Sequence, residues 1–159
     1  MPLYVKYGEI DGKVETEGYE KWIEANSFQW SVGRSIASPV GASADREASH
    51  PSVSEITLSK EIDVSTNKLL EQALGGNLDT KVEIAVCTTG QGQLKEFLRY
   101  ILANTALSGY SVASSGDRPI ESLSLNFTKI EIKYTSLNMT LDGSPASTIY
   151  DLALQKLNG

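Results

Sequence analysis

The sequence predicts a mainly β protein, a small antiparallel β-barrel with one short α-helix and a long extended loop. Three observations carry this prediction. Several segments alternate apolar and polar residues with a period of two, as half-buried strands do. Only one segment has the apolar spacing of a helix, and residues 33–53 show neither period.

Length and composition predict a single globular domain over residues 1–159. The chain has 40% hydrophobic and 21% charged residues and a net charge of -6. This acidic balance argues against a nucleic-acid partner, because phosphate neutralisation requires clustered basic residues. One Cys and one His exclude an internal disulfide, Cys-rich metal sites and His-cluster metal sites. We therefore expect no metal and no cofactor.

The first half of the chain begins with strand-like alternation. Leu3, Val5 and Tyr7 alternate with more polar positions, and the run 22–32 places Phe28, Trp30 and Val32 on one face. Residues 33–53 then contain two Gly, two Pro and many Ser and Ala. So long a loop inside a compact domain is usually functional or disordered.

The only helix is expected at residues 65–74, with Asp63 or Ser65 as its N-terminal cap. Gly75 and Gly76 are expected to end it in the left-handed conformation common after helices. An apolar stripe should close one mouth or side of the β-structure, and its residues are Thr66, Leu69, Leu70, Ala73 and Leu74.

Strands fill the second half. Val82, Ile84 and Val86 alternate cleanly, and residues 88–93 have the composition of a hairpin turn. The long apolar segment 97–112 contains Gly109, which predicts a bulge or bend. Apolar residues then change from odd positions (123–127) to even ones (130–134), which predicts a β-bulge near Thr128. A last short strand is expected at 148–152.

Candidate catalytic residues are few. His50 is the single imidazole and lies in the 33–53 loop, where nothing fixes its orientation, and Cys87 ends an apolar strand as a small core residue would. Gly90 and Gly92 indicate a turn and not a phosphate loop, because neither a third glycine nor a following helix is present. We therefore predict a structural or binding protein and not an enzyme.

Several segments in order resemble one family, the haemolysin-coregulated protein (Hcp) of type VI secretion. They are Ile10–Gly12 followed by 22–33, the 33–53 loop, the strand-to-helix passage 58–69, and the strand 123–134. Tyr150 and Asp151 depart from this pattern, because many members carry a Trp-containing pair there.

The resemblance implies a structural subunit of the secretion system's inner tube. Family members form homohexameric rings that stack head to tail inside a contractile sheath and beneath a spike protein. Contraction expels them, and some carry small effectors in the ring lumen. The chain would lie in the bacterial cytoplasm before firing and outside the cell afterwards, with no membrane insertion. The N-terminus agrees with this, since it has no secretory signal pattern.

Within this interpretation, the 33–53 loop is expected to make contacts between stacked rings. Its small residues allow close approach of another subunit, and its charged tip could form ion pairs across the stack. The candidate contact residues are Ile36, Ser38, Val40, Asp45, Arg46 and Glu47.

Two other interpretations stay open. A carbohydrate- or ligand-binding β-sandwich is favoured by Trp22, Trp30 and the tyrosines, although alternating aromatic residues are more often core. A phage-type tail-tube protein is a nearer relative of the first interpretation. Rings or featureless monomers in negative-stain images would separate the tube from the β-sandwich.

Overall fold

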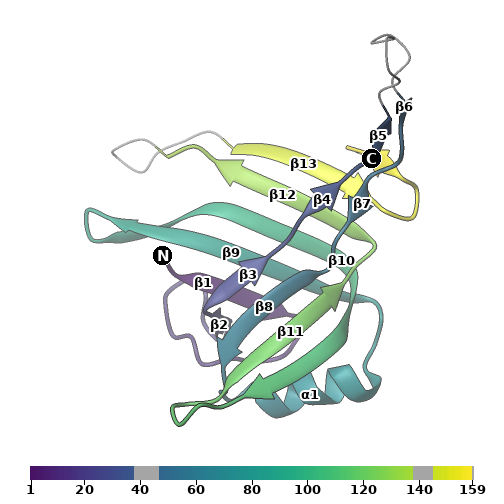
Figure 1. Ribbon diagram of the computed structural model, residues 1–159. Coiled ribbons are helices and arrows are strands. Elements are labelled where there is room, and N and C mark those ends of the chain that lie inside the picture. The colour runs from purple at the N-terminus through teal and green to yellow at the C-terminus, as the bar shows by residue number, and fades with distance from the viewer. Residues whose placement is uncertain (38–46, 138–144, 159) are drawn as a thin grey trace.

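The computed structural model describes residues 1–37, 47–137 and 145–158 (Figure 1). These ranges contain one helix, α1 (Thr66–Gly75), and fourteen strands. In chain order the strands are β1 (Leu3–Tyr7), β2 (Ile23–Ala25), β3 (Ser27–Gln29), β4 (Val32–Gly33), β5 (Ile36–Ala37), β6 (Glu47–Ala48), β7 (Ser52–Val53), β8 (Ile56–Glu61), β9 (Thr80–Gly90), β10 (Gln93–Ala113), β11 (Ile120–Asn126), β12 (Lys129–Thr135), β13 (Pro145–Asp151) and β14 (Lys156–Leu157). The predicted mainly β chain with one short helix is confirmed.

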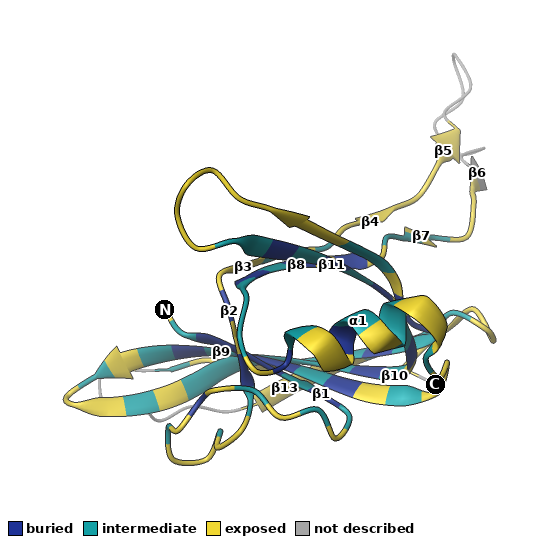
Figure 2. Ribbon diagram, turned by 90° about the horizontal axis from the view of Figure 1, so that it is seen from below, coloured by how far each residue is buried: buried dark blue, intermediate teal, exposed yellow. Residues whose placement is uncertain are grey.

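The strands form a barrel of two layers, and all of their pairings are antiparallel. One layer runs β14-β13-β12-β10-β9-β1-β2, and the other runs β10-β11-β8-β3. The long strand β10 belongs to both layers. On the far side the layers are joined because only Asn26 separates β2 from β3, and its N–H donates to the Ser59 carbonyl at 2.7 Å. Figure 2 shows the layers with α1 between them.

The barrel interior holds the predicted alternating apolar residues. Leu3, Val5 and Tyr7 are buried in one cluster with Val82 and Ile84. Each inward side chain is followed by an outward one, so a strand needs apolar residues only at alternate positions.

The opposite face of β1 is also buried, which the alternation did not predict. Residues 8–22, here called the strap, fold back over the outer face of β1 and β9. A second cluster of Tyr4, Val14, Ala85 and Cys87 forms beneath the strap, with Tyr19, Trp22 and Leu94 at its margin.

The helix lies one residue from its predicted bounds, but two details of the prediction are wrong. Leu69 is fully buried against the barrel, whereas Leu74 is 79% exposed, so the apolar stripe stops before the last turn. Gly76 is extended (φ −80°), so the helix does not end in a left-handed glycine. A Cβ on Gly76 would collide with Gln72, and this close approach explains the glycine.

The N-terminus of α1 is held by Asp63 and not by a hydroxyl cap. Ser65 is the N-cap residue, but its side chain caps no helix N–H. Instead, the Ser65 N–H donates to the Asp63 carboxylate at 2.8 Å, and the Asp63 N–H donates to Thr66 Oγ1 at 3.0 Å.

The strand irregularities follow the sequence closely. The β9–β10 hairpin turns at Gln91 and Gly92, both with positive φ, as predicted for residues 88–93. The register between β10 and β11 shifts next to Gly109, which confirms that bulge. Near Thr128 the strand breaks into β11 and β12 without a change of register along β10, so the predicted bulge is a break.

The described residues of the predicted 33–53 loop, 33–37 and 47–53, form the outer part of a hairpin arm that projects from the barrel (Figures 1 and 2). We define the arm as residues 30–37 and 47–55. β4 pairs with β7, and β5 pairs with β6. These two-residue ladders continue the β3–β8 pairing outward. Because each ladder is so short, no alternating pattern marks it in the sequence.

Candidate functional site

Both candidate catalytic side chains occupy places where nothing activates them. Cys87 is fully buried beneath the strap, and burial raises the pKa of its thiol, which disfavours the reactive thiolate. His50 is exposed on the arm between β6 and β7. The two residues therefore belong to separate parts of the structure and form no nucleophile–base pair.

A buried ion cluster lies where α1 joins the barrel. Lys60 Nζ is 3.1 Å from Glu121 Oε1 and 3.1 Å from Asp63 Oδ1, and it donates to the Glu61 carbonyl at 2.9 Å. Thr66 Oγ1 donates to the same Glu121 oxygen at 2.5 Å. Lys60 and Glu121 are 1% and 0% exposed.

This cluster holds the helix and leaves no room for a substrate. The cavity beside Lys60 has a volume of about 10 Å³ and is lined mainly by apolar residues, which is space for about one water molecule. Because Thr66 opens α1 and Asp63 precedes it, their bonds to β8 and β11 fix the helix against the barrel.

The arm carries the predicted ring-stacking residues that the structure describes. Ile36 is exposed in β5, and Glu47 lies in β6, where its backbone pairs with Ala37. The other four predicted residues, Ser38, Val40, Asp45 and Arg46, lie outside the described residues. No ring contact is tested by a single chain, so their role stays a prediction.

Serine hydroxyls and backbone bonds stabilise the arm. The Ser35 N–H donates to Ser49 Oγ at 3.0 Å, and the Ser31 N–H donates to Ser54 Oγ at 2.9 Å. The backbone N–H groups of Ser49 and Ser54 donate back across the hairpin, each at 2.9 Å. The serine-rich composition therefore provides hydrogen bonds where the strands are too short to provide them.

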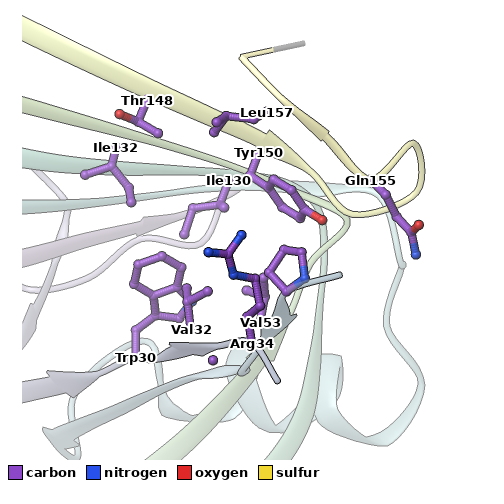
Figure 3. A pocket seen from close by; sticks show the side chains of 12 residues that line it. Trp30, Val32, Arg34, Val53, Ile130, Ile132, Thr148, Tyr150, Gln155 and Leu157 are labelled. Atoms are coloured by element: carbon purple, nitrogen blue, oxygen red, sulfur yellow. The ribbon is translucent and has the colours of Figure 1, made fainter. Parts of the chain in front are cut away.

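An apolar groove of about 540 Å³ lies between the base of the arm and the edge of the barrel (Figure 3). Its walls come from β4, β7, β12, β13 and β14. The lining side chains are mostly apolar and include Trp30, Val32, Val53, Ile130, Tyr150 and Leu157. At the surface Val32 is 52% exposed and Leu157 is 62% exposed. The groove is thus an exposed continuation of the core.

Two hydrogen-bond donors lie in this apolar groove without acceptors. Trp30 Nε1 is buried and, within the described residues, has no hydrogen-bond partner. The Arg34 guanidinium points into the groove, and no carboxylate of the described residues lies within ion-pair distance of it (Figure 3). Leaving the buried Trp30 Nε1 donor unpaired is unfavourable, whereas Arg34 is exposed and reaches water. The groove therefore favours an occupant that brings an acceptor for Trp30 Nε1.

Sequence reasoning did not find this groove. Trp30 and Val32 were placed together on one face, but Arg34, Ile132 and Leu157 were not connected with them. The three segments 30–34, 130–132 and 148–157 meet only through the sheet order. The one available signal was Arg34, an isolated cation among small residues.

Both tryptophans are engaged in packing. Trp30 meets Tyr100 edge-on at 5.9 Å between ring centroids, and Trp22 meets Tyr19 edge-on at 5.2 Å. The Arg99 guanidinium lies 5.5 Å from the Trp22 ring. Both rings therefore take part in the packing of the fold, as alternating aromatic residues usually do.

The described part of the chain contains no group of three His, Cys, Asp or Glu residues that could hold a metal ion. Of the helical segments described, none has the length and apolar character needed to cross a membrane.

Solved structures that share this fold are type VI secretion proteins. A structure described as a type six secretion system protein has a TM-score of 0.89 and 22% identity, and the match covers 99% of each chain. Hcp1 from Salmonella typhimurium has a TM-score of 0.78 and 18% identity, with 98% of this chain and 97% of that chain covered. A type VI secretion system effector from Yersinia pestis has a TM-score of 0.72 and 20% identity, with 94% and 98% covered. At these identities the likeness shows the fold.

Sequence comparison supplies the family. No curated protein gives a significant sequence match. A family model described as "Type VI secretion system effector, Hcp" matches residues 4–134, which include the barrel from β1 to β12, α1 and the arm. Since this match spans most of the chain, the chain belongs to the Hcp family of type VI secretion proteins.

Proposed function

We propose that this protein is the structural subunit of a type VI secretion inner tube, in which homohexameric rings stack head to tail. Membership of the Hcp family is the observation that carries the proposal. Expulsion by sheath contraction, a spike protein above the tube and small effector cargo in the lumen belong to the same proposal. So does location in the bacterial cytoplasm before secretion and outside the cell afterwards.

The surface of the single chain supports association with other copies. β13 and β14 end one sheet, and the last residues of β14, Lys156 and Leu157, are exposed. Unprotected sheet edges and exposed apolar grooves are sites where other chains pair or pack. A structural role is also supported by the inactive surroundings of Cys87 and His50, which favour a protein that is not an enzyme.

The mass of the purified protein tests this proposal. Light scattering coupled to size exclusion should give about six times 17.2 kDa, and negative-stain images should show rings with a central hole. A monomer at micromolar concentration would contradict the tube function.

The 33–53 loop is proposed to make the contacts between stacked rings, through Ile36, Ser38, Val40, Asp45, Arg46 and Glu47. Six subunits carry a charge of about -36, since each carries -6. Repulsion between rings is screened beyond about 8 Å at physiological salt, so local contacts decide whether rings stack. Single exposed ion pairs contribute about 0–1 kcal/mol, but six symmetric copies add across one ring face.

Replacing residues 36–48 by a short Gly-Ser linker tests the arm separately. Hexameric rings should persist, because the barrel is unchanged, while tubes and secretion should be lost. Tubes that still assemble, or rings that dissociate, would place the arm at a different interface.

A further inference from the structure

The groove beneath the arm is where the core reaches the surface. Ile130 is buried in the main core, and Trp30, Val53, Ile132 and Tyr150 pack against that core while lining the groove. α1 lies at the other end of the barrel (Figure 1). The barrel is therefore closed at one end by its own helix and left open at the other.

The open end calls for an occupant of particular chemistry. Its walls are apolar, Trp30 Nε1 is a buried donor without a partner among the described residues, and the exposed Arg34 guanidinium lies beside these walls. A buried donor without an acceptor is destabilising, and a cation beside apolar walls favours a carboxylate. The occupant should therefore present an exposed apolar side chain next to an acidic one.

This combination is found on the chain itself, at the end of the barrel that α1 closes. Leu74 is 79% exposed and Leu78 is 73% exposed. Asp79 follows directly, is exposed, and has no ion-pair partner among the described residues. The last turn of α1 contains no basic residue that could neutralise it. This segment precedes β9, whose first residue Thr80 pairs with Thr105 of β10, whereas the groove lies between the arm and β12–β14. The segment and the groove are therefore two different surfaces of the chain.

We propose that residues 74–79 of one subunit seat in the groove of the next subunit of the same ring. Leu78 packs against Val32 and Leu157, and Asp79 pairs with Arg34. The inference rests on the proposed tube function and specifies its contact within the ring. Two different surfaces joined head to tail form a heterologous interface, which closes when the rotation between subunits completes a ring. Trp and Arg at the centre of a desolvated patch are typical of residues that dominate binding.

A charge exchange tests the pair. Arg34→Glu and Asp79→Lys should each raise the protein concentration at which rings half-dissociate by at least about tenfold, as loss of a desolvated charge pair does. The double variant Arg34→Glu/Asp79→Lys should recover most of this loss. Glu17→Lys is the matched control, because Glu17 is also exposed and forms no ion pair within the described residues. It should leave dissociation unchanged.

A covalent link identifies which neighbour is involved. A variant carrying Val32→Cys and Leu78→Cys should form, under oxidising conditions, a ladder of linked chains that ends at six. Cys87 can remain, because it is fully buried. Val32→Cys with Val112→Cys is the control, since Val112 is exposed but lies outside the proposed contact.

The outcomes separate the two proposals. Rings that form normally, without charge rescue and without a ladder, would overturn this inference and leave the tube function intact. A ladder that forms only when rings have stacked into tubes would also overturn it, because the contact would then lie between rings. A wild-type monomer would contradict the tube function itself.

Discussion

The two ends of the barrel differ in what covers their apolar side chains: α1 covers one end, and the groove beside the arm leaves the other exposed. At the α1 end, Leu69 fills the core, and Lys60 forms ion pairs with Glu121 and Asp63 inside the chain, although Asp63 Oδ2 and Glu121 Oε2 accept no hydrogen bond from the described residues. At the arm end, apolar walls remain exposed, Trp30 Nε1 is buried without an acceptor among the described residues, and Arg34 has no ion-pair partner among them. On the contact proposed above, the first end is completed within the chain, whereas the second is completed by another chain.

This difference separates folding residues from assembly residues. A buried side chain at the α1 end contributes to the stability of every subunit, so its loss should change unfolding. An exposed side chain at the arm end or in residues 74–79 should change assembly and leave the subunit fold nearly unaffected. Stability and ring mass are therefore two independent measurements, made at one protein concentration because association adds to apparent stability.

The largest effect is expected from Lys60→Met at the closed end. This change leaves the carboxylates of Glu121 and Asp63 buried and adjacent without their cation. Removing one partner of a buried ion pair costs about 3–5 kcal/mol. Urea unfolding should show a loss of this size.

Lys68→Met is the matched control for Lys60→Met. Lys68 pairs with Glu71 at 3.5 Å on the exposed side of α1, where an ion pair contributes about 0–1 kcal/mol. If the two variants unfolded at the same urea concentration, the buried cluster would not hold the helix.

The next largest effect on unfolding is expected at Leu69, in contrast to Leu74 of the same helix. Leu69→Ala should lower the free energy of unfolding by about 2–5 kcal/mol, because it leaves a cavity in the core. Leu74→Ala should change it by less than about 0.5 kcal/mol, since the side chain is exposed, and should instead weaken ring formation. If the two variants lost the same free energy of unfolding, the distinction between a folding residue at Leu69 and an assembly residue at Leu74 would be wrong.

The closed end was largely predictable from the sequence. Alternation located β1, β9 and β11, and the spacing of Leu69 located the helix and its buried face. Leu74 was predicted to be buried because helical spacing continues through it. The barrel leaves the Leu74 side chain in the last turn uncovered. The spacing of apolar residues in a helix does not show which of them another element covers.

The open end could not be predicted in the same way. Trp30, Ile132 and Tyr150 come from three separate segments, and only the order of strands in the sheet brings them together. The burial of Tyr4 was missed for a related reason, because the strap that covers it has no regular period. Residues 36–37 and 47–48 pair through two-residue ladders, which are too short to show alternation.

Cys87 lies in the barrel wall, and its substitution is expected to have an effect on unfolding smaller than those at the closed end. Cys87→Ser should cost about 1–3 kcal/mol in unfolding free energy, because a hydroxyl buried there needs a hydrogen-bond partner. His50→Ala should change stability by less than about 0.5 kcal/mol, as an exposed arm residue. Both variants should retain rings and secretion, and loss of a measurable hydrolytic activity in either would overturn the proposed absence of catalysis.

The smallest effect concerns alkaline pH and the strap over the barrel wall. Burial, then the neighbouring Cys87 and Glu96, raise the pKa of Tyr19 well above its usual range. The folded chain therefore keeps this phenol neutral, whereas the unfolded chain loses its proton near pH 10. Stability from this group is fully present below about pH 10 and falls as the pH rises further, because ionisation then favours the unfolded state.

Tyr19→Phe should therefore flatten the decrease in stability between about pH 9 and 11. At pH 8 the variant should be about 1 kcal/mol less stable, since the 3.0 Å bond from the Tyr19 hydroxyl to Glu96 is lost. This deficit should shrink as the pH rises. Tyr134→Phe, at a tyrosine that is 51% exposed, should follow the wild-type pH profile. If stability fell with pH in parallel for Tyr19→Phe and the wild type, the strap would open before the phenol ionises. The strap would then not protect the barrel wall.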